Sequence, residues 1–335
     1  MPHRNIPVFI PQIGCPHVCV FCDRRAVSTG ERFDESALRP FLENALATIP
    51  ENDPPEIAYF GGSFTGIERG LMIRLLDLAA DYVRQGRVSG IRLSTRPDLI
   101  DGEVLDILER YPISAVELGI QSMDDRVLEA SGRGHTAERS AIACAAVREA
   151  GFALVGQVMP GLPASTPQSD RETAERVCAL GVSACRIYPT VVFRGTVLAE
   201  MTVKGSYRPM SLEEAVERSA DVLEIFRSHG VPCLRIGLHA TEALTSPDSV
   251  LAGPNHPALG ELVLGELYYR ELISACRKGN LTGRRIRLTV PRGEASRAVG
   301  QNRKNLIRLL KETGTVVTRV REAAINGMTV EEDHQ

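Results

Sequence analysis

The sequence predicts an α/β fold in which parallel strands alternate with helices. Two observations predict it: short runs rich in apolar and β-branched residues recur along the first part of the chain, and amphipathic stretches long enough for crossover helices separate them. Six runs are expected to be strands, at 6–10, 56–62, 90–95, 114–120, 152–159 and 183–190. Repeated units of this kind build one sheet with helices outside it, either doubly wound or curled towards a barrel.

Helices follow from the apolar periodicity between these strands. The clearest crossover helices are expected at 36–49, 71–84 and 137–150, and a longer helix is expected over 211–229. A short strand in "PCLRIGL" would then close the sheet, and a polar stretch punctuated by Gly and Pro follows it. We therefore expect a body at 1–240, a linker at 241–258 and a C-terminal region at 259–325.

The C-terminal region is expected to be a small α/β unit of its own. The pattern predicts helices at 259–277, 293–298 and 303–312, with strands at 284–290 and 315–320. Between Leu281 and Glu322 eleven Lys or Arg residues face three acidic ones, so this segment carries +8 although the whole chain carries −3. Opposite charge in two parts of one chain indicates an acidic body with a basic binding attachment.

Length and composition bound the class of protein. The 335 residues are 43% apolar, enough for one large domain with an appendage or for two domains. No apolar run approaches the roughly 18 residues of a membrane span, and the first residues lack the apolar stretch of a signal peptide. Eight cysteines without a disulfide-like framework are typical of a reducing compartment. We expect a cytoplasmic protein.

Three of the cysteines are clustered in "GCPHVCVFC", at Cys15, Cys19 and Cys22. Thiolates at such short intervals form a chelating loop and select zinc, copper(I) or iron–sulfur iron. A structural zinc site would need a fourth ligand, for which His17 and His3 are the candidates. Three ligands on a four-iron cluster would instead leave one iron open to an exchangeable molecule. The other five cysteines stand singly and are interpreted as core or surface residues: Cys144, Cys178, Cys185, Cys233 and Cys276.

The C-x3-C-x2-C spacing resembles the signature of radical S-adenosylmethionine (radical SAM) enzymes. This resemblance implies a partial (β/α)6 TIM-like barrel and a 4Fe–4S cluster on Cys15, Cys19 and Cys22. It also implies that the open iron binds the methionine part of S-adenosylmethionine and that Phe21 packs near the adenine.

Polar side chains at the ends of the expected strands are candidate cofactor-binding residues, because functional residues of parallel barrels gather at the carboxyl ends of strands. The alternatives are structural: Gly61 and Gly62 would form a tight turn, and Gln157, Tyr188 and Arg194 would be turn or core residues. Glu117, in a buried run, needs a partner, either Arg96 or a ligand's ribose or amino-acid group. The candidates are Gly61, Gly62, Ser63, Thr95, Arg96, Glu117, Gln121, Ser122, Gln157 and Tyr188.

Six segments in order over 56–201 carry a closer resemblance: "FGGSFT", "STRPD", "VELGIQS", "GRGHT", "MPGLP" and "RIYPTVVFRGT". Together they resemble the radical SAM domain of the Elongator catalytic subunit, which modifies wobble uridines in tRNA. Two departures limit the comparison. The first cysteine interval is shorter here, and we expect no acetyltransferase domain, so the resemblance leaves the use of acetyl-CoA open.

The segment "RAVGQNRKNLIRLLKETG" resembles the helix, G-x-x-G loop and helix of KH domains, which hold single-stranded RNA on that loop. Arg303 stands where the second glycine would be. The resemblance implies RNA contacts from Gly300, Arg303, Lys304 and Arg308, and the alternative is a solvated basic helix pair.

Taken together, the sequence predicts a radical SAM enzyme acting on RNA, with tRNA as the expected substrate and a flavodoxin or ferredoxin as a typical electron donor. One alternative is the same chemistry on a small metabolite or a protein. The other is a non-catalytic RNA-binding protein stabilised by a metal or a cluster. No catalytic side chain is assigned.

Overall fold

The computed structural model describes residues 4–10, 14–22, 33–50, 52–238 and 249–334. Its body is a seven-stranded sheet in the order β1-β2-β3-β4-β5-β6-β8, with every neighbouring pair parallel. This half-barrel confirms the predicted fold and adds the strand in "PCLRIGL" as its seventh member. The strands are β1 (Asn5–Ile10), β2 (Glu56–Gly61), β3 (Gly90–Thr95), β4 (Ile113–Gln121), β5 (Ala153–Val158), β6 (Ala184–Ile187) and β8 (Cys233–Ile236).

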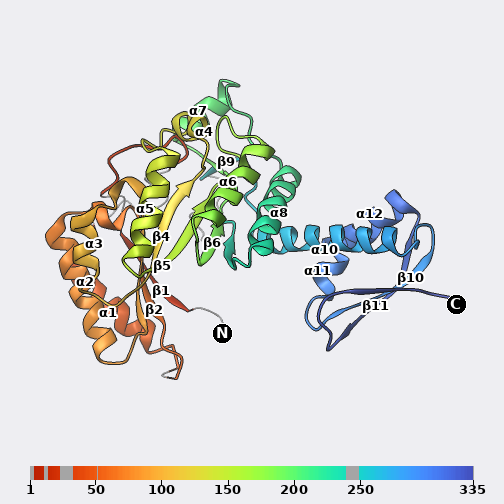
Figure 1. Ribbon diagram of the computed structural model, residues 1–335, viewed down its shortest axis with the longest axis horizontal. Coiled ribbons are helices and arrows are strands. Elements are labelled where there is room, and N and C mark those ends of the chain that lie inside the picture. The colour runs from red at the N-terminus through yellow and green to blue at the C-terminus, as the bar shows by residue number, and fades with distance from the viewer. Residues whose placement is uncertain (1–3, 11–13, 23–32, 51, 239–248, 335) are drawn as a thin grey trace.

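Helices cover the outer face of this sheet (Figure 1). The helices predicted at 36–49, 71–84, 137–150 and 211–229 are all present. Polar side chains fix their starts: Thr136 accepts a hydrogen bond from the Arg139 amide, and Ser211 forms a reciprocal capping box with Glu214. The helices of the body are α1 (Glu35–Leu46), α2 (Arg69–Arg84), α3 (Gly102–Leu108), α4 (Asp125–Ala130), α5 (Ala137–Glu149), α6 (Pro167–Ala179), α7 (Val197–Val203) and α8 (Leu212–Ser228), with 3-10 turns η1 (Phe64–Gly66) and η2 (Pro97–Leu99).

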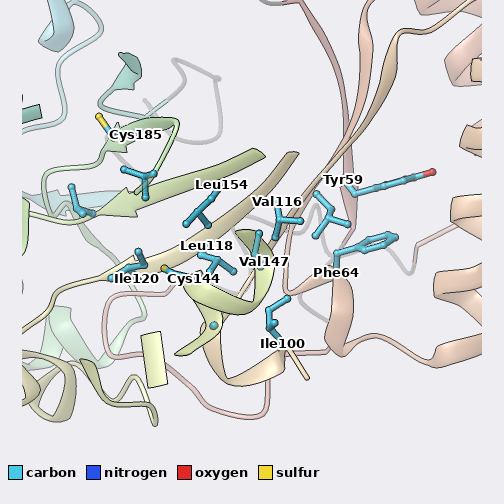
Figure 2. Packing of buried hydrophobic residues seen from close by; sticks show 14 of the residues in the cluster. Tyr59, Phe64, Ile100, Val116, Leu118, Ile120, Cys144, Val147, Leu154 and Cys185 are labelled. Atoms are coloured by element: carbon cyan, nitrogen blue, oxygen red, sulfur yellow. The ribbon is translucent and has the colours of Figure 1, made fainter. Parts of the chain in front are cut away.

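The hydrophobic core lies between the sheet and these helices. Because successive side chains of a strand point to opposite faces, Val116, Leu118 and Ile120 of β4 share the face that Cys144 and Val147 of α5 cover (Figure 2). Burying one such aliphatic side chain contributes about 1.5–3 kcal/mol. The alternate positions of these strands include charged groups such as Arg92, Glu117 and Arg186, which lie on the other, concave face together with apolar residues such as Ala115 and Val155.

The C-terminal region forms a second unit with its own core, including Leu272, Cys276 and Ile286. Figure 1 shows this unit projecting from the body on the long helix α10 (Leu259–Lys278), which packs against α8. Its sheet has the order β11-β10-β12, with β10 and β11 parallel and β12 antiparallel. The remaining elements are β10 (Arg285–Pro291), α11 (Ala295–Val299), η3 (Gln301–Arg303), α12 (Lys304–Thr313), β11 (Val316–Ala323) and β12 (Thr329–Glu332).

The predicted elements of this region are all found, and β12 is an additional strand. The expected linker lies partly outside the described residues. Its described part includes β9 (Val250–Ala252), which pairs antiparallel with β7 (Val192–Phe193). In the part of the chain that the structure describes, no helix is long and apolar enough to cross a membrane.

Candidate functional site

The cysteine loop follows β1 and lies over the ends of β2 and β3. Cys15 Sγ lies 3.2 Å from Ser63 Oγ, directly after β2. Gly14 has φ +97°, and a Cβ on it would lie 2.5 Å from the Gly66 carbonyl carbon. No side chain fits between two backbones at that distance, so Gly14 is required where the loop meets η1.

A second loop, residues 131–135 between α4 and α5, supports the cysteine loop from the other side. The Val20 amide donates to the Ser131 carbonyl at 3.0 Å. A Cβ on Gly134 would lie 2.3 Å from His17 Cδ2, so the His17 ring packs directly on this loop. The segment is the "GRGHT" motif of the sequence, and its position gives that motif a structural role beside the cysteines.

Two arginines contact the middle cysteine. Cys19 is buried, and its Sγ accepts from Arg133 Nη1 at 3.3 Å and from Arg96 Nη1 at 3.6 Å. Arg96 also pairs with Asp98, with Nε 2.9 Å from Oδ1, and donates to the Arg133 carbonyl. The Cys19 sulfur is therefore buried and accepts hydrogen bonds from two guanidinium groups.

His135 in the same loop adds no positive charge at neutral pH. Burial, and after it the charge of Arg133, lower the pKa of His135 to about 4, although Asp98 lies 3.7 Å from its Nδ1 and acts in the opposite direction. The two guanidiniums near Cys19 thus face a single carboxylate, that of Asp98.

Phe21 and Cys22 are the last two described residues of the cysteine loop. Phe21 packs against an apolar cluster that includes Val192 and Leu198, and the Cys22 amide donates to the Cys19 carbonyl at 3.1 Å. Among the described residues no three His, Cys, Asp or Glu side chains are gathered closely enough to hold one metal ion. The His17 ring packs on Gly134 of the second loop, and His3 lies outside the described residues.

Gly61 and Thr95, two of the predicted cofactor residues, have clear structural roles. Gly61 ends β2 with φ +108°, and a Cβ there would lie 2.3 Å from the Ile10 carbonyl oxygen of β1. Thr95 Oγ1 lies 2.6 Å from Thr65 Oγ1, and Thr65 donates to the Leu99 carbonyl, which ties η1 to η2. Gly62 and the buried Ser63 follow β2, and Ser63 contacts Cys15; their role in cofactor binding stays a prediction.

Glu117 has partners, but not the one predicted. Its Oε1 accepts from Arg92 Nη1 at 3.2 Å and from Arg186 Nη2 at 3.0 Å, and Arg186 Nε lies 2.8 Å from Oε2. The prediction of an Arg96–Glu117 pair is wrong, because Arg96 comes after the end of β3 and turns towards Asp98. Arg92 sits within β3 on the concave face and also pairs with Glu56 at 2.8 Å.

The remaining candidates differ in whether their polar atoms have hydrogen-bond partners within the protein. Gln121 has φ +68° at the bulge that ends β4, and its buried Oε1 has no hydrogen-bond partner. Ser122 accepts from the Asp124 amide and so supports the start of α4. Tyr188 Oη lies 3.5 Å from Arg186 Nη1, and burial raises the pKa of Tyr188. Gln157 is half-buried on β5.

The structure thus groups the candidates in two sets. Cys15, Cys19, Ser63 and Arg96 lie at the strand ends, and Glu117 lies with arginines on the concave face of the sheet; Arg194 is exposed. Sequence reasoning missed Arg92, Arg133 and Arg186. The need of Glu117 for a partner was a signal for Arg92 and Arg186, whereas nothing in "GRGHT" indicated that Arg133 contacts a cysteine.

The basic C-terminal loop has the expected tight conformation. Gly300, Asn302 and Arg303 all have positive φ, and Asn305 closes the turn by donating to the carbonyls of Gly265, Arg297 and Ala298. Arg303 and Lys304 are exposed at its tip, the latter 3.9 Å from Glu213.

Arg308 differs from its neighbours Arg303 and Lys304. It pairs with Glu266 at 2.7 Å and Glu312 at 2.8 Å and lies over the Tyr269 ring. Its charge is therefore compensated inside the unit, whereas the side chains of Arg303 and Lys304 are exposed. The resemblance of this region to a KH domain stays a prediction.

Comparison with known proteins agrees with this geometry. Residues 9–177 match the model of the Radical SAM superfamily, and residues 182–269 match that of the Radical SAM C-terminal domain. An uncharacterised protein of Methanocaldococcus jannaschii is 30% identical over 66% of this chain and 71% of its own length. The tRNA uridine(34) acetyltransferase of Dehalococcoides mccartyi is 33% identical over 61% of this chain.

Among solved structures, Methanocaldococcus infernus Elp3 with its N-terminus deleted superposes with a TM-score of 0.61 at 24% identity, over 70% of this chain and 58% of that one. This likeness shows a shared fold. The chain spans only 52% of the Dehalococcoides acetyltransferase that it matches.

Proposed function

This chain belongs to the radical SAM superfamily, whose members bind a 4Fe–4S cluster and S-adenosylmethionine, and we propose that it modifies RNA, with tRNA as the substrate. The cluster chemistry is supported by the environment of Cys19, a buried sulfur in a cysteine triplet with two guanidinium donors. The observation that carries RNA as the substrate is the exposed pair Arg303 and Lys304 in a segment of charge +8.

The residues present fit a cluster and its S-adenosylmethionine. Cys15, Cys19 and Cys22 provide three soft thiolate ligands, which iron–sulfur clusters prefer. The buried Gln121 Oε1 is an acceptor without a protein donor and can take a hydrogen bond from a ligand. When bound, the cluster and S-adenosylmethionine supply the electron transfer and radical chemistry.

The protein's own contribution includes a rigid, buried cluster of charges on the concave face of the sheet. Glu117 is held by two arginines and is therefore fixed in position, with little freedom to reorient when a ligand binds. The Thr65–Thr95 hydrogen bond joins the two turns beside the loop. Fixed donors and acceptors of this kind orient a substrate without reorganisation during the reaction.

The basic C-terminal unit supports RNA as the substrate class. The exposed Arg303 and Lys304 lie on a tight turn within a segment of charge +8. Clustered exposed cations bind phosphates and deliver nucleic acid by electrostatic attraction. The relative named a tRNA uridine(34) acetyltransferase points to tRNA within that class.

The experiment is anaerobic purification of the full chain followed by sequencing of the RNA that accompanies it. The reduced enzyme is then mixed with S-adenosylmethionine, with and without that RNA. We expect 5′-deoxyadenosine formation to rise when the RNA is present and a modified nucleoside to appear in it. Cleavage of S-adenosylmethionine that is indifferent to RNA would favour a small metabolite or protein substrate. Failure to cleave it at all would favour a non-catalytic RNA-binding protein.

A further inference from the structure

Arg133 is a buried cation for which the described residues offer no carboxylate partner. Arg133 is only 5% exposed, and its Nη2 donates to the Gly119 carbonyl at 2.6 Å. Its Nη1 donates to Cys19 Sγ at 3.3 Å, and its Nε has no hydrogen-bond partner. A buried charge is costly unless an opposite charge compensates it. The group that faces the guanidinium is the Cys19 sulfur.

The other charged groups near Cys19 are already paired. Arg96, the second donor to the sulfur, is compensated by Asp98, and His135 is neutral at neutral pH. Glu117 is engaged by Arg92 and Arg186 on the concave face of the sheet. One positive charge thus remains uncompensated, and it belongs to Arg133.

The backbone around Arg133 is suited to this placement. Gly132 and Gly134 flank it with φ +64° and φ +72°, conformations that glycine adopts without strain. The space beside Gly134 is filled by the His17 ring, and a Cβ on Gly132 would lie 3.3 Å from the Val18 carbonyl oxygen. Side chains at these two positions would push the cysteine loop away from the guanidinium.

We propose that Arg133 is a positioning residue that supplies the positive charge opposite the Cys19 thiolate and thereby raises the reduction potential of the cluster that this thiolate would hold. The inference rests on the proposed function, since it takes Cys19 as a cluster ligand. Reduction by a low-potential donor protein would add one electron to such a cluster and make it more negative by one charge. A buried cation and a hydrogen bond to a ligating sulfur both favour the more negative state.

The test compares four full-length proteins after anaerobic reconstitution: wild type, Arg133→Gln, Arg133→Lys and Arg139→Gln. Arg139 is the matched control, because it is a partly buried arginine nearby that donates to the Ile100 carbonyl instead of a sulfur. Iron and sulfide per chain are measured first, and the midpoint potential of the cluster is then measured by redox titration followed by electron paramagnetic resonance.

We expect Arg133→Gln to keep its iron and to shift the oxidised-to-reduced equilibrium about tenfold towards the oxidised cluster, which for one electron is about 59 mV more negative. Arg133→Lys should fall between wild type and Arg133→Gln, and Arg139→Gln should match wild type. An unchanged midpoint in Arg133→Gln would overturn the proposal while leaving the proposed function intact. A wild type that takes up no cluster would overturn the proposed function itself.

If Arg133→Gln loses the cluster, its midpoint potential cannot be measured, and cluster retention in Arg133→Lys tests the proposal instead. If Arg133→Lys then keeps the cluster, the positive charge distinguishes the two proteins and the proposal is supported. If both variants lose it equally while Arg139→Gln retains it, the charge is not what the loop requires and the proposal is contradicted.

Discussion

Arg133 and Cys19 are 114 positions apart in the sequence, yet the guanidinium donates to the thiol sulfur at 3.3 Å. The contact forms because the cysteine loop after β1 and the loop before α5 lie against each other at the carboxyl ends of the strands. Parallel strands bring the ends of distant segments to one edge of a sheet. In this chain that edge places a buried cation beside the central cysteine of the triplet.

Gly61→Ala should destabilise the body through the contact of β2 with β1. Its φ of +108° suits only glycine, and the new Cβ would lie 2.3 Å from the Ile10 carbonyl oxygen. We expect a loss of unfolding free energy larger than the roughly 1–2 kcal/mol that positive φ alone costs, measured by urea denaturation. Gly86→Ala is the matched control, with φ +70° but nothing within 4 Å of the added Cβ. Equal losses in the two variants would exclude the contact as the cause.

Glu117→Gln should remove the charge that compensates two buried arginines. Arg92 keeps Glu56 as a partner, whereas Arg186 has no other carboxylate partner among the described residues. Removing one member of a buried ion pair typically costs about 3–5 kcal/mol. Denaturant unfolding checks this value, and Glu43→Gln, at an exposed pair with Arg87, should cost much less. A neutral effect at Glu117 would mean that solvent compensates Arg186.

His135 should make stability depend on pH. Its pKa is about 4 in the folded protein, against a value near 6.5 for the unfolded chain, so the unfolded state binds more protons between these values. Folding stability should therefore fall as the pH decreases from about 6.5 towards 4, and the loss should reach a few kcal/mol. Unfolding free energies across this window should show a shallower slope in His135→Gln. The same slope in both proteins would assign the dependence to other groups.

RNA binding by the basic unit should depend on salt through Arg303 and Lys304. Each phosphate contact contributes a slope of roughly 0.7 to the fall of log affinity with log salt for single strands. Arg303→Glu with Lys304→Glu should flatten this slope and weaken binding to all sequences alike, because phosphate contacts carry no sequence information. Fluorescence anisotropy with labelled RNA measures both effects.

The control for that measurement reverses two exposed cations of the body, with Arg84→Glu and Lys204→Glu. The change in net charge is the same, but the two residues lie on α2 and directly after α7, far along the chain from the turn at Gly300. Equal loss of RNA affinity in the two double variants would show that overall net charge, and not the turn at Gly300, causes the effect. Salt-independent binding in the wild type would remove RNA as the proposed substrate.

The strands and most helices of the body follow from periodicity, because apolar side chains such as Val116 and Leu118 must face the helices while polar ones alternate with them. The cysteine triplet is equally visible, since its ligands are neighbours in sequence. The partners of Glu117, in contrast, are not evident from the sequence. Alternation places Arg92 on the correct face, but Arg186 comes from β6, and only the curvature of the sheet brings it within reach.

Arg133 shows a second limit of sequence reasoning. Its role depends on the contact between two loops, which is set by glycine conformations and backbone packing at Gly134 and His17. Nothing in the spacing of "GRGHT" indicates that its arginine points to a cysteine. Arg308 shows a third limit. The sequence indicates a free cation in a basic helix, but Glu266 of α10 and Glu312 of its own helix compensate the charge of Arg308.

The measurement that tests the account most directly is the metal content of the chain and of its cysteine variants after anaerobic isolation and reconstitution. The wild type should carry about four irons per chain, and Cys15→Ala, Cys19→Ala and Cys22→Ala should each lose them. Cys144→Ser and Cys276→Ser, at buried thiols in the two hydrophobic cores, should keep them. Stoichiometric zinc without iron in the wild type, or full iron in any variant of the triplet, would contradict the assignment of the cluster to Cys15, Cys19 and Cys22.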